Sequence, residues 1–445
     1  MKSYSVTEIS KKAKGASVLL ANVSEEDRND ALEEMALALE SNVEFIMSEN
    51  KRDLEEFKKI DPAADASPLY QRLMLTDSKI RDMIAGIRDV KKLEDPIGKT
   101  LSSMELDDEL MLYQISCPIG VIGVVFEARP DVVPQILALC LKSGNATIFK
   151  GGAEATNSNK ALFDILTNAM KKIPEIPVEA FGLLETREEV SQLLEMDEYI
   201  DLLIPRGSNE FIKYIQDNTR IPVLGHTSGI CHAYVDESYD KNITYDVCLD
   251  SKIQYPAACN AIETLLVNRK IANDFLPKMG KIYEEHNVTL LCDNDSYKIL
   301  KDAKINAEKA TEEDWDAEYN DMILAIKIVD SVNEAIEHIN THGSHHTDAI
   351  CATDKKAIDL FTSLVDSADV MVNASTRFAD GFRFGKGAEV GISTNKIHAR
   401  GPVGMEGLMS YKYLIFGNGH KVSDYESGDK KYTHVSSNKK YCRLG

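Results

Sequence analysis

From about residue 110 to residue 236 the chain alternates between short apolar strands and helical segments. Residues 111–130 are β-rich and interrupted by glycines, and residues 132–144 then have helical spacing. The same alternation continues through residues 145–150, 161–172, 180–185, 187–196, 199–205 and 206–215. Regular strand–helix alternation predicts a parallel sheet covered by helices, with ligand sites at the carboxyl ends of its strands. We therefore expect an α/β fold.

The residues before this region are expected to be helical scaffold. Ser24 precedes three acidic residues and a periodic apolar segment, which is typical of a capped helix N-terminus. Helical spacing also runs from about residue 69 to residue 94, where Asp95-Pro96 predicts a turn. At 445 residues the chain exceeds one ordinary core, so two or three domains are expected.

Charge and cysteine usage exclude some classes of partner. The net charge is −21, from 72 acidic and 51 basic side chains, which argues against nucleic acid or an anionic membrane as the main partner. The eight cysteines are scattered without a CxxC pair, which favours reduced thiols in a cytoplasmic protein. No apolar run approaches the ~18 residues of a membrane span, and the N-terminus lacks a secretory apolar core.

The segment 251–260 carries the strongest candidate for covalent chemistry. Pro256 suits the first position of a helix, and the residues after it could continue that helix. Cys259 would then lie in the first helical turn, where unpaired N–H groups and the helix dipole stabilise a thiolate. A thiolate is the nucleophile of acyl-transfer chemistry. The alternative is that Cys259 is a small buried apolar residue, as many free cysteines are.

Two glycine-containing turns indicate a phosphate-bearing ligand. Lys150 ends an apolar strand and precedes Gly151-Gly152, where a backbone can approach a ligand closely. Gly207-Ser208 opens a helix directly after a strand, so its N–H groups could receive an anion. The GxGxxG dinucleotide fingerprint is absent, and a surface lysine beside a plain turn is the alternative interpretation.

Together with Cys259, the order of these segments resembles the aldehyde dehydrogenase superfamily. The resemblance is closest to its gamma-glutamyl phosphate reductase (glutamate-5-semialdehyde dehydrogenase) family and runs nearly end to end. It is carried by PIGVIGVVFEARPDV, SGNATIFKGGAEA, IPRGSNEFI, SKIQYPAACNAIETLLV and EVGISTNKIHARGPVGMEGL. It implies an aldehyde dehydrogenase-like fold of two doubly wound α/β lobes with a small β oligomerisation flap.

The resemblance also implies roles for individual residues. Cys259 matches the family nucleophile and Lys150 the lysine that holds the cofactor's adenosine ribose. Gly207 and Ser208 match the turn over which the pyrophosphate passes, and Glu318 the acid that holds the nicotinamide ribose. The reductase family uses NADPH, which is the cofactor expected here. Glu154 near Lys150 is a departure, because an acid there is how NAD-preferring relatives hold the 2′-hydroxyl.

One further departure concerns the chemistry of release. Hydrolytic relatives carry a water-activating glutamate in the segment that corresponds to residues 222–229, and this chain has no carboxylate there. The resemblance therefore implies NADPH-dependent reduction of gamma-glutamyl phosphate to glutamate 5-semialdehyde plus phosphate, through a Cys259 thioacyl intermediate, in proline biosynthesis. His226 is a candidate replacement base, although a lone histidine in such a loop is more often structural.

Several basic residues are candidates for binding the substrate's anionic groups. Arg129 stands near where the superfamily has an asparagine oxyanion donor, and it could neutralise a leaving phosphate. A glycine-rich run from about 373 to 404 concentrates further cations, which are alternatively solvated loop charges: Arg377, Arg383, Lys386, Lys396 and Arg400. No metal is expected, because the histidine loop has no cysteine or acid at metal spacing and is best interpreted as polar: His342, His345 and His346.

The expected domains follow from the resemblance. Residues 1–104 and 121–230, with part of 373–400, form the cofactor-binding domain, and residues 231–372 form the catalytic domain. Residues 105–120 and 401–419 form the oligomerisation flap, and 420–445 a loosely held polar tail. A homodimer or higher homo-oligomer is expected, and channelling of substrate from glutamate 5-kinase stays open. The alternatives are a hydrolytic aldehyde dehydrogenase and a catalytically inactive relative.

Overall fold

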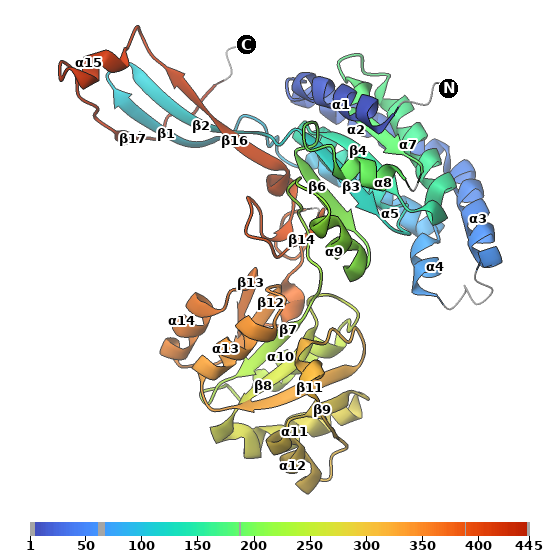
Figure 1. The fold of residues 1–445 in the computed structure, drawn as a ribbon, viewed down its shortest axis with the longest axis vertical. Helices are drawn as coiled ribbons and strands as arrows, with labels where there is room; N and C mark the ends of the chain where they lie inside the picture. Colours follow the sequence, from blue (N-terminus) through green and yellow to red (C-terminus); the bar gives the residue numbers. More distant parts are fainter. Residues whose placement is uncertain (1–4, 61–66, 187, 388, 443–445) are drawn as a thin grey trace. The chain divides into compact units, whose positions relative to one another are not determined.

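The computed structural model describes residues 5–60, 67–186, 188–387 and 389–442. The chain forms two compact units, each with its own sheet (Figure 1). Unit 1 takes the chain up to Leu224, with Gly387–Gly391 and the segment from Val403 on; unit 2 comprises Gly225–Lys386 and Ile392–Pro402. No helix among the described residues is long and apolar enough to cross a membrane.

Unit 1 is built on a parallel sheet in the order β5-β4-β3-β6. Its strands are β3 (Val121–Phe126), β4 (Ala146–Gly151), β5 (Phe181–Leu184) and β6 (Leu202–Arg206). The strand order reverses between β3 and β6, and the carboxyl edge of a sheet at such a reversal is where α/β proteins bind ligands. The predicted strand–helix alternation is confirmed in this unit.

Helices pack around the unit 1 sheet, with α1 and α6 against β4. Ser24 begins the second helix as predicted, because its hydroxyl accepts a hydrogen bond from the Asp27 N–H at 3.1 Å. The helices of this unit are α1 (Val6–Leu20), α2 (Glu25–Ser41), α3 (Val43–Ile60), α4 (Pro68–Leu73), α5 (Asp77–Lys92), α6 (Val132–Ser143), α7 (Thr156–Met170), α8 (Glu189–Leu194) and α9 (Asn209–Asp217).

A second, antiparallel sheet of unit 1 has the order β16-β2-β1-β17. It consists of β1 (Thr100–Asp107), β2 (Leu110–Pro118), β16 (Met409–Phe416) and β17 (Val435–Ser437), and we call it the flap sheet. The described part of the predicted polar tail contacts this sheet at two places. β17 pairs with β1, helix α15 (Val422–Glu426) lies between, and Tyr441 stacks on Phe416. A three-residue strand is too short to show a period in the sequence.

Unit 2 is built on a parallel sheet in the order β10-β9-β11-β8-β7-β12-β13. The strands are β7 (Cys231–Val235), β8 (Ile262–Asn268), β9 (Thr289–Cys292), β10 (Glu308–Lys309), β11 (Ile323–Val329), β12 (Thr347–Cys351) and β13 (Asp369–Val372). The helices are α10 (Thr244–Ile253), α11 (Arg269–Glu285), α12 (Asn294–Asp302), α13 (Val332–His342) and α14 (Lys355–Leu364). The short strands β14 (Gly391–Ser393) and β15 (Gly401–Val403) pair where the chain passes between units.

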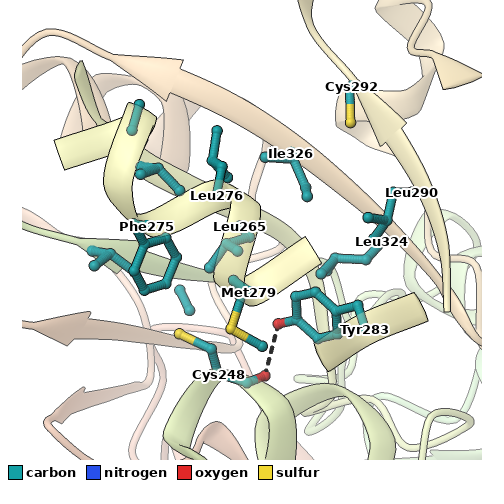
Figure 2. Packing of buried hydrophobic residues seen from close by; sticks show 14 of the residues in the cluster. Cys248, Leu265, Phe275, Leu276, Met279, Tyr283, Leu290, Cys292, Leu324 and Ile326 are labelled. Atoms are coloured by element: carbon teal, nitrogen blue, oxygen red, sulfur yellow. Dashed lines mark hydrogen bonds between the residues drawn. The ribbon is translucent and has the colours of Figure 1, made fainter. Parts of the chain in front are cut away.

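The main core of unit 2 lies between this sheet and helix α11. Phe275, Leu276 and Met279 of α11 are fully buried against Leu265 and Ile326 of the sheet (Figure 2). The Tyr283 hydroxyl donates to the Cys248 carbonyl oxygen at 3.0 Å, which ties α11 to α10 (Figure 2). This packing fixes α10 and β8, the two elements on either side of Cys259.

A buried histidine lies on the other side of the unit 2 sheet. His338 of α13 is 5% exposed, packs edge-on against Trp315, and has its Nδ1 3.2 Å from the Nζ of Lys327. Burial, with the charges of His232, Lys327 and His342, lowers the pKa of His338 to about 2. His338 is therefore neutral in the folded chain throughout the physiological range.

This histidine predicts acid sensitivity. Below the ordinary histidine pKa of about 6.5 the unfolded chain binds a proton that folded His338 cannot, so stability falls as pH falls. We expect the loss to be about 1.4 kcal/mol per pH unit, or about 2 kcal/mol at pH 5. The His338→Gln variant should lose less stability than wild type between pH 7 and pH 5 in urea unfolding. His286→Gln, at an exposed histidine, is the matched control; equal pH slopes for wild type and His338→Gln would contradict the prediction.

Candidate active site

Three chemically active side chains meet at one edge of the unit 2 sheet. Cys259 precedes β8, His226 precedes β7 and His346 directly precedes β12, and these three strands are adjacent and parallel. The amino ends of adjacent parallel strands share one edge of the sheet, so these side chains are brought together. The Cys259 Sγ and one ring nitrogen of each histidine all lie within 4.8 Å of one another.

The local structure at Cys259 differs from the predicted helix. Helix α10 ends at Ile253, the chain turns through hydrogen bonds from Ala258 N–H to Tyr255 O and from Ala261 N–H to Ala258 O, and β8 then begins. The prediction of a helix through residues 257–267 is wrong. A short apolar run is compatible with either a helix or a buried strand, and here all of β8 is buried in the sheet. The helix-dipole argument for thiolate stabilisation does not apply.

The loop 225–229 lies directly against the cysteine backbone. A Cβ added at Gly229 would lie 2.2 Å from the Cys259 carbonyl oxygen and 2.5 Å from its Cα, so only glycine fits. The same carbonyl oxygen accepts a hydrogen bond from the Cys231 thiol at 3.2 Å. The loop 225–229, which has no carboxylate, is therefore the segment that touches the half-buried Cys259. This loop brings the His226 ring close to the thiol.

Hydrogen bonds fix the two imidazoles in this cluster. The Nδ1 of His226 is 3.0 Å from the Ile392 carbonyl oxygen, which can only accept, so Nδ1 carries a hydrogen. The His346 ring packs edge-on against His226, with centroids 4.9 Å apart, and its Nδ1 is 2.8 Å from the Thr347 hydroxyl. Burial holds the pKa of His346 well below its usual range, so this ring is neutral.

The histidine loop, predicted to be polar, buries one of its three imidazoles, that of His346. His346 is 0% exposed, and its Nε2 has no hydrogen-bond partner among the described residues. The other two histidines make structural contacts, His342 with Asp316 and His345 with the Asp366 carbonyl oxygen. One feature of the sequence could have predicted that His346 and Cys259 meet. His346 directly precedes one apolar strand and Cys259 stands just before another, and residues before parallel strands share one edge of the sheet.

The predicted cations of the glycine-rich run fall into two groups within unit 2. Arg377 is 9% exposed and donates to the Gln254 side chain at 2.8 Å, and its backbone carbonyl accepts from Arg383. Burial and the charge of Arg383 lower the pKa of Arg377, while the negative charge of Cys259 opposes that shift. Arg377 therefore lies beside the cysteine loop, and Arg383 contacts Arg377.

The second group of cations is held by one carboxylate. Lys396 and Arg400 both pair with Asp366, at 2.6 and 3.2 Å. These two cations lower the pKa of Asp366, although its own burial raises it. An ion-pair network accounts for them without a substrate.

A buried ion pair supports the residues around β8. Lys252 and Glu263 are 0% and 1% exposed in their side chains, and their charged atoms lie 2.6 Å apart. Burial raises the pKa of Glu263 to about 7 and lowers the pKa of Lys252, while each partner's charge opposes the other's shift. Glu263 also accepts a hydrogen bond from the Asn320 N–H at 3.2 Å, and the charge of Glu318 contributes to raising the pKa of Glu263. Glu318 thus lies on a loop fastened to the first residues of β8.

The residues predicted to bind the cofactor's adenosine half lie at the carboxyl edge of the unit 1 sheet. Lys150 is at the end of β4, 4% exposed, and its ammonium group donates to the Gly151 carbonyl oxygen. Burial lowers the pKa of Lys150, opposed by the charges of Glu189 and Glu154. Glu154 is already held by the backbone, since it accepts from the Ala128 N–H.

The start of helix α9 in unit 1 binds a carboxylate of the same chain, that of Glu127. Ser208 caps α9, and its backbone N–H donates to the Glu127 carboxylate at 2.8 Å. A Cβ at Gly207 would lie 2.5 Å from that carboxylate, so glycine permits the close approach. Arg129 lines a separate cleft of about 380 Å³ in unit 1, with Arg72 and Lys79.

The contact between Gly229 and Cys259 predicts that any side chain at position 229 is costly. In Gly229→Ala the new methyl group must displace the Cys259 backbone, so we expect a loss of about 1–3 kcal/mol in the free energy of unfolding. Urea denaturation measures this loss. Gly15→Ala in α1, where a Cβ would have no atom within 4 Å, is the matched control and should not destabilise the chain. Equal stabilities of the two variants would show that the loop and the cysteine do not touch.

Comparison with known proteins agrees with this architecture. The family model described as "Aldehyde dehydrogenase family" matches residues 1–296. A gamma-glutamyl phosphate reductase from Methanosarcina acetivorans is 61% identical, over 97% of this chain and 97% of that protein. The crystal structure of a gamma-glutamyl phosphate reductase from Thermotoga maritima superposes with a TM-score of 0.90 at 38% identity, covering 94% of this chain and 100% of that one.

A more distant structure shares the fold alone. Glyceraldehyde-3-phosphate dehydrogenase from Methanocaldococcus jannaschii, complexed with NADP, has a TM-score of 0.62 at 15% identity and covers 94% of this chain and 96% of that one. The predicted aldehyde dehydrogenase-like α/β fold is confirmed. The chain belongs to the aldehyde dehydrogenase family and, within it, to the gamma-glutamyl phosphate reductases.

Proposed function

We propose that this chain reduces gamma-glutamyl phosphate to glutamate 5-semialdehyde and inorganic phosphate, with NADPH, as a step of proline biosynthesis. The name of its 61%-identical relative supports this assignment. The observation that carries it is the half-buried Cys259, covered by a loop, residues 225–229, that has no carboxylate. Such a site can form a thioester but lacks the acid that would activate water to hydrolyse it.

Cys259 is the nucleophile of the proposed reaction. Its thiolate attacks the acyl carbon of gamma-glutamyl phosphate, the bond from that carbon to the phosphate oxygen breaks, and phosphate leaves a thioester on the sulfur. One ring nitrogen of His226 and one of His346 lie within 4.8 Å of the Cys259 Sγ, and burial keeps His346 neutral, so a ring nitrogen is close to the thiol as a proton acceptor. Bound NADPH supplies the hydride that brings the acyl carbon to the aldehyde level. The sulfur is freed when glutamate 5-semialdehyde departs.

Arg377 and Arg383 are the proposed contacts for the substrate's anionic groups. Arg377 lies beside the cysteine loop and Arg383 donates to the backbone carbonyl of Arg377, and a buried arginine close to the thiolate can stabilise negative charge that develops on a substrate. Lys396 and Arg400 are weaker candidates, because Asp366 already pairs with both. Arg129 stays a proposal for the phosphate on the strength of its position in the sequence.

NADPH binding is proposed for the residues that the family resemblance names. Lys150 would hold the adenosine ribose, the Gly207-Ser208 turn the pyrophosphate, and Glu318 the nicotinamide ribose. The fit is supported by the Ser208 N–H, which already binds a carboxylate, and by the glycine that permits its approach. A distant relative with the same fold is complexed with NADP.

The flap sheet is the proposed site of self-association. β16 is an outer strand of that sheet, and Tyr411, Tyr413 and Ile415 on it are more than half exposed. An exposed apolar row beside an unpaired strand edge is a common interface between copies of a chain. A homodimer or higher homo-oligomer follows, and direct transfer of the acyl phosphate from glutamate 5-kinase is compatible with it. All eight cysteines are free thiols, which supports a cytoplasmic location.

The reductase and hydrolase interpretations differ in their need for phosphate. If no residue of the loop 225–229 activates water, oxidation of glutamate 5-semialdehyde by NADP should require inorganic phosphate or arsenate. Without either, we expect a burst of at most one NADPH per active site and then arrest. Absorbance of NADPH in phosphate-free buffer, followed by addition of phosphate, measures both phases.

The matched control for this experiment is Cys259→Ser. It should melt like wild type, show no burst, and lose activity by roughly three to six orders of magnitude, as removal of a nucleophile does. Steady turnover of wild type to glutamate without phosphate would show that water reaches the thioester, and the chain would then be a hydrolytic dehydrogenase.

Lys150 provides a test of the cofactor assignment. Lys150→Met keeps most of the buried side-chain volume but removes the ammonium group, so NADPH should bind about 10- to 100-fold more weakly, as expected for the loss of a charge-assisted hydrogen bond. Isothermal titration with NADPH measures the affinity. Lys160→Met, at a half-exposed ion pair with Glu185, is the control and should leave it unchanged. Unchanged affinity in Lys150→Met would remove Lys150 from the cofactor site.

A further inference from the structure

The cluster of Cys259, His226 and His346 has the composition of a soft-metal site. Thiolate and imidazole are the ligands preferred by Zn²⁺, and three protein ligands leave a fourth position open. Ligand atoms around tetrahedral Zn²⁺ lie about 3.3 to 3.8 Å apart, from metal–ligand distances of about 2.0 to 2.3 Å. The three atoms here already lie within 4.8 Å of one another, so a shift of about 1 Å would bring them to that spacing.

Both imidazoles are held in place through their Nδ1 atoms. His226 donates from Nδ1 to the Ile392 carbonyl oxygen. A backbone carbonyl on the remote nitrogen is the usual support of a metal-bound histidine. His346 has its Nδ1 against Thr347, while its Nε2 is buried without a hydrogen-bond partner among the described residues. A buried ring nitrogen without a partner is costly, and in the tautomer that carries its hydrogen on Nδ1 a bound cation would satisfy Nε2.

We propose that Cys259, His226 and His346, all in unit 2, bind one Zn²⁺-type cation that reversibly blocks the nucleophile. Binding is a ligand exchange without oxidation or reduction. The sulfur–hydrogen bond of Cys259 is replaced by a sulfur–metal bond and one proton is released, and the thiolate and the two imidazoles, each in its neutral form, replace three waters on the cation. The metal is an inhibitor of the thiol and not a cofactor of the reaction.

The ligand set also defines which cations bind. No carboxylate belongs to the cluster, so the hard cations Mg²⁺ and Ca²⁺, which require several oxygen ligands, are excluded. A metal-bound sulfur cannot attack an acyl carbon. Zn²⁺ and substrate should therefore exclude each other, and the bound cation should protect the thiol from alkylation.

Cobalt is the probe that reports the ligands directly. Co²⁺ added to the metal-stripped full chain should produce a thiolate-to-cobalt charge-transfer band and the intense visible bands of tetrahedral coordination, at one cobalt per chain. Zn²⁺ should abolish these bands by displacement. Cys259→Ser should lack the charge-transfer band, and His226→Asn and His346→Asn should each bind Co²⁺ at least tenfold more weakly. His345→Asn, at a neighbouring histidine outside the cluster, should bind like wild type.

Labelling of wild type provides a second readout that does not depend on the variants folding. Zn²⁺ should slow alkylation of Cys259 by iodoacetamide at least tenfold, and EDTA should restore the rate. The exposed Cys442 serves as the internal control and should react at the same rate throughout. Mass spectrometry of the two peptides measures both rates. Absence of the charge-transfer band, full affinity in both histidine variants, or equal Cys259 labelling with and without Zn²⁺ would each overturn the proposal, whether or not the reductase reaction is confirmed.

Discussion

The contact between the Gly229 backbone and the Cys259 backbone is the constraint on which the rest of the site depends. It brings the loop before β7 against the loop before β8, with no room for a side chain between them. His226 reaches the thiol because its loop is held there, and His346 arrives from the adjacent strand β12. The buried pair Lys252–Glu263 links helix α10 to β8, and Glu263 also holds the loop that carries Glu318.

Local patterns in the sequence predict the fold well. The strand–helix alternation, the Ser24 cap, Lys150 at a strand end and Gly207-Ser208 before a helix all depend on residues close together in the chain. The helix predicted after Pro256 fails because a buried parallel strand has no polar face, so the fully buried β8 shows the same apolar run as a helix. Whether this segment forms a helix or a strand is decided by the neighbouring strands of the sheet.

The composition of the site is harder to predict than the fold. His346 and His226 are 120 positions apart and meet only because β7 and β12 are neighbours in the sheet. No single segment of the sequence determines the order of strands in a sheet, so a histidine loop without a cysteine at metal-ligand spacing gives no sign of the cysteine that it meets in the fold. The same applies to Lys396 and Arg400, whose partner Asp366 lies outside the glycine-rich run.

The short strand β17 has a consequence for the far end of the chain. It covers the outer edge of β1, which would otherwise present unpaired N–H and C=O groups, beside the apolar side chains of the flap sheet. The C-terminal segment therefore protects the edge of the flap sheet from pairing with other chains. A chain truncated before Val435 would keep both of its α/β cores but would expose the edge of β1. An extended peptide could then add to that edge as a further strand.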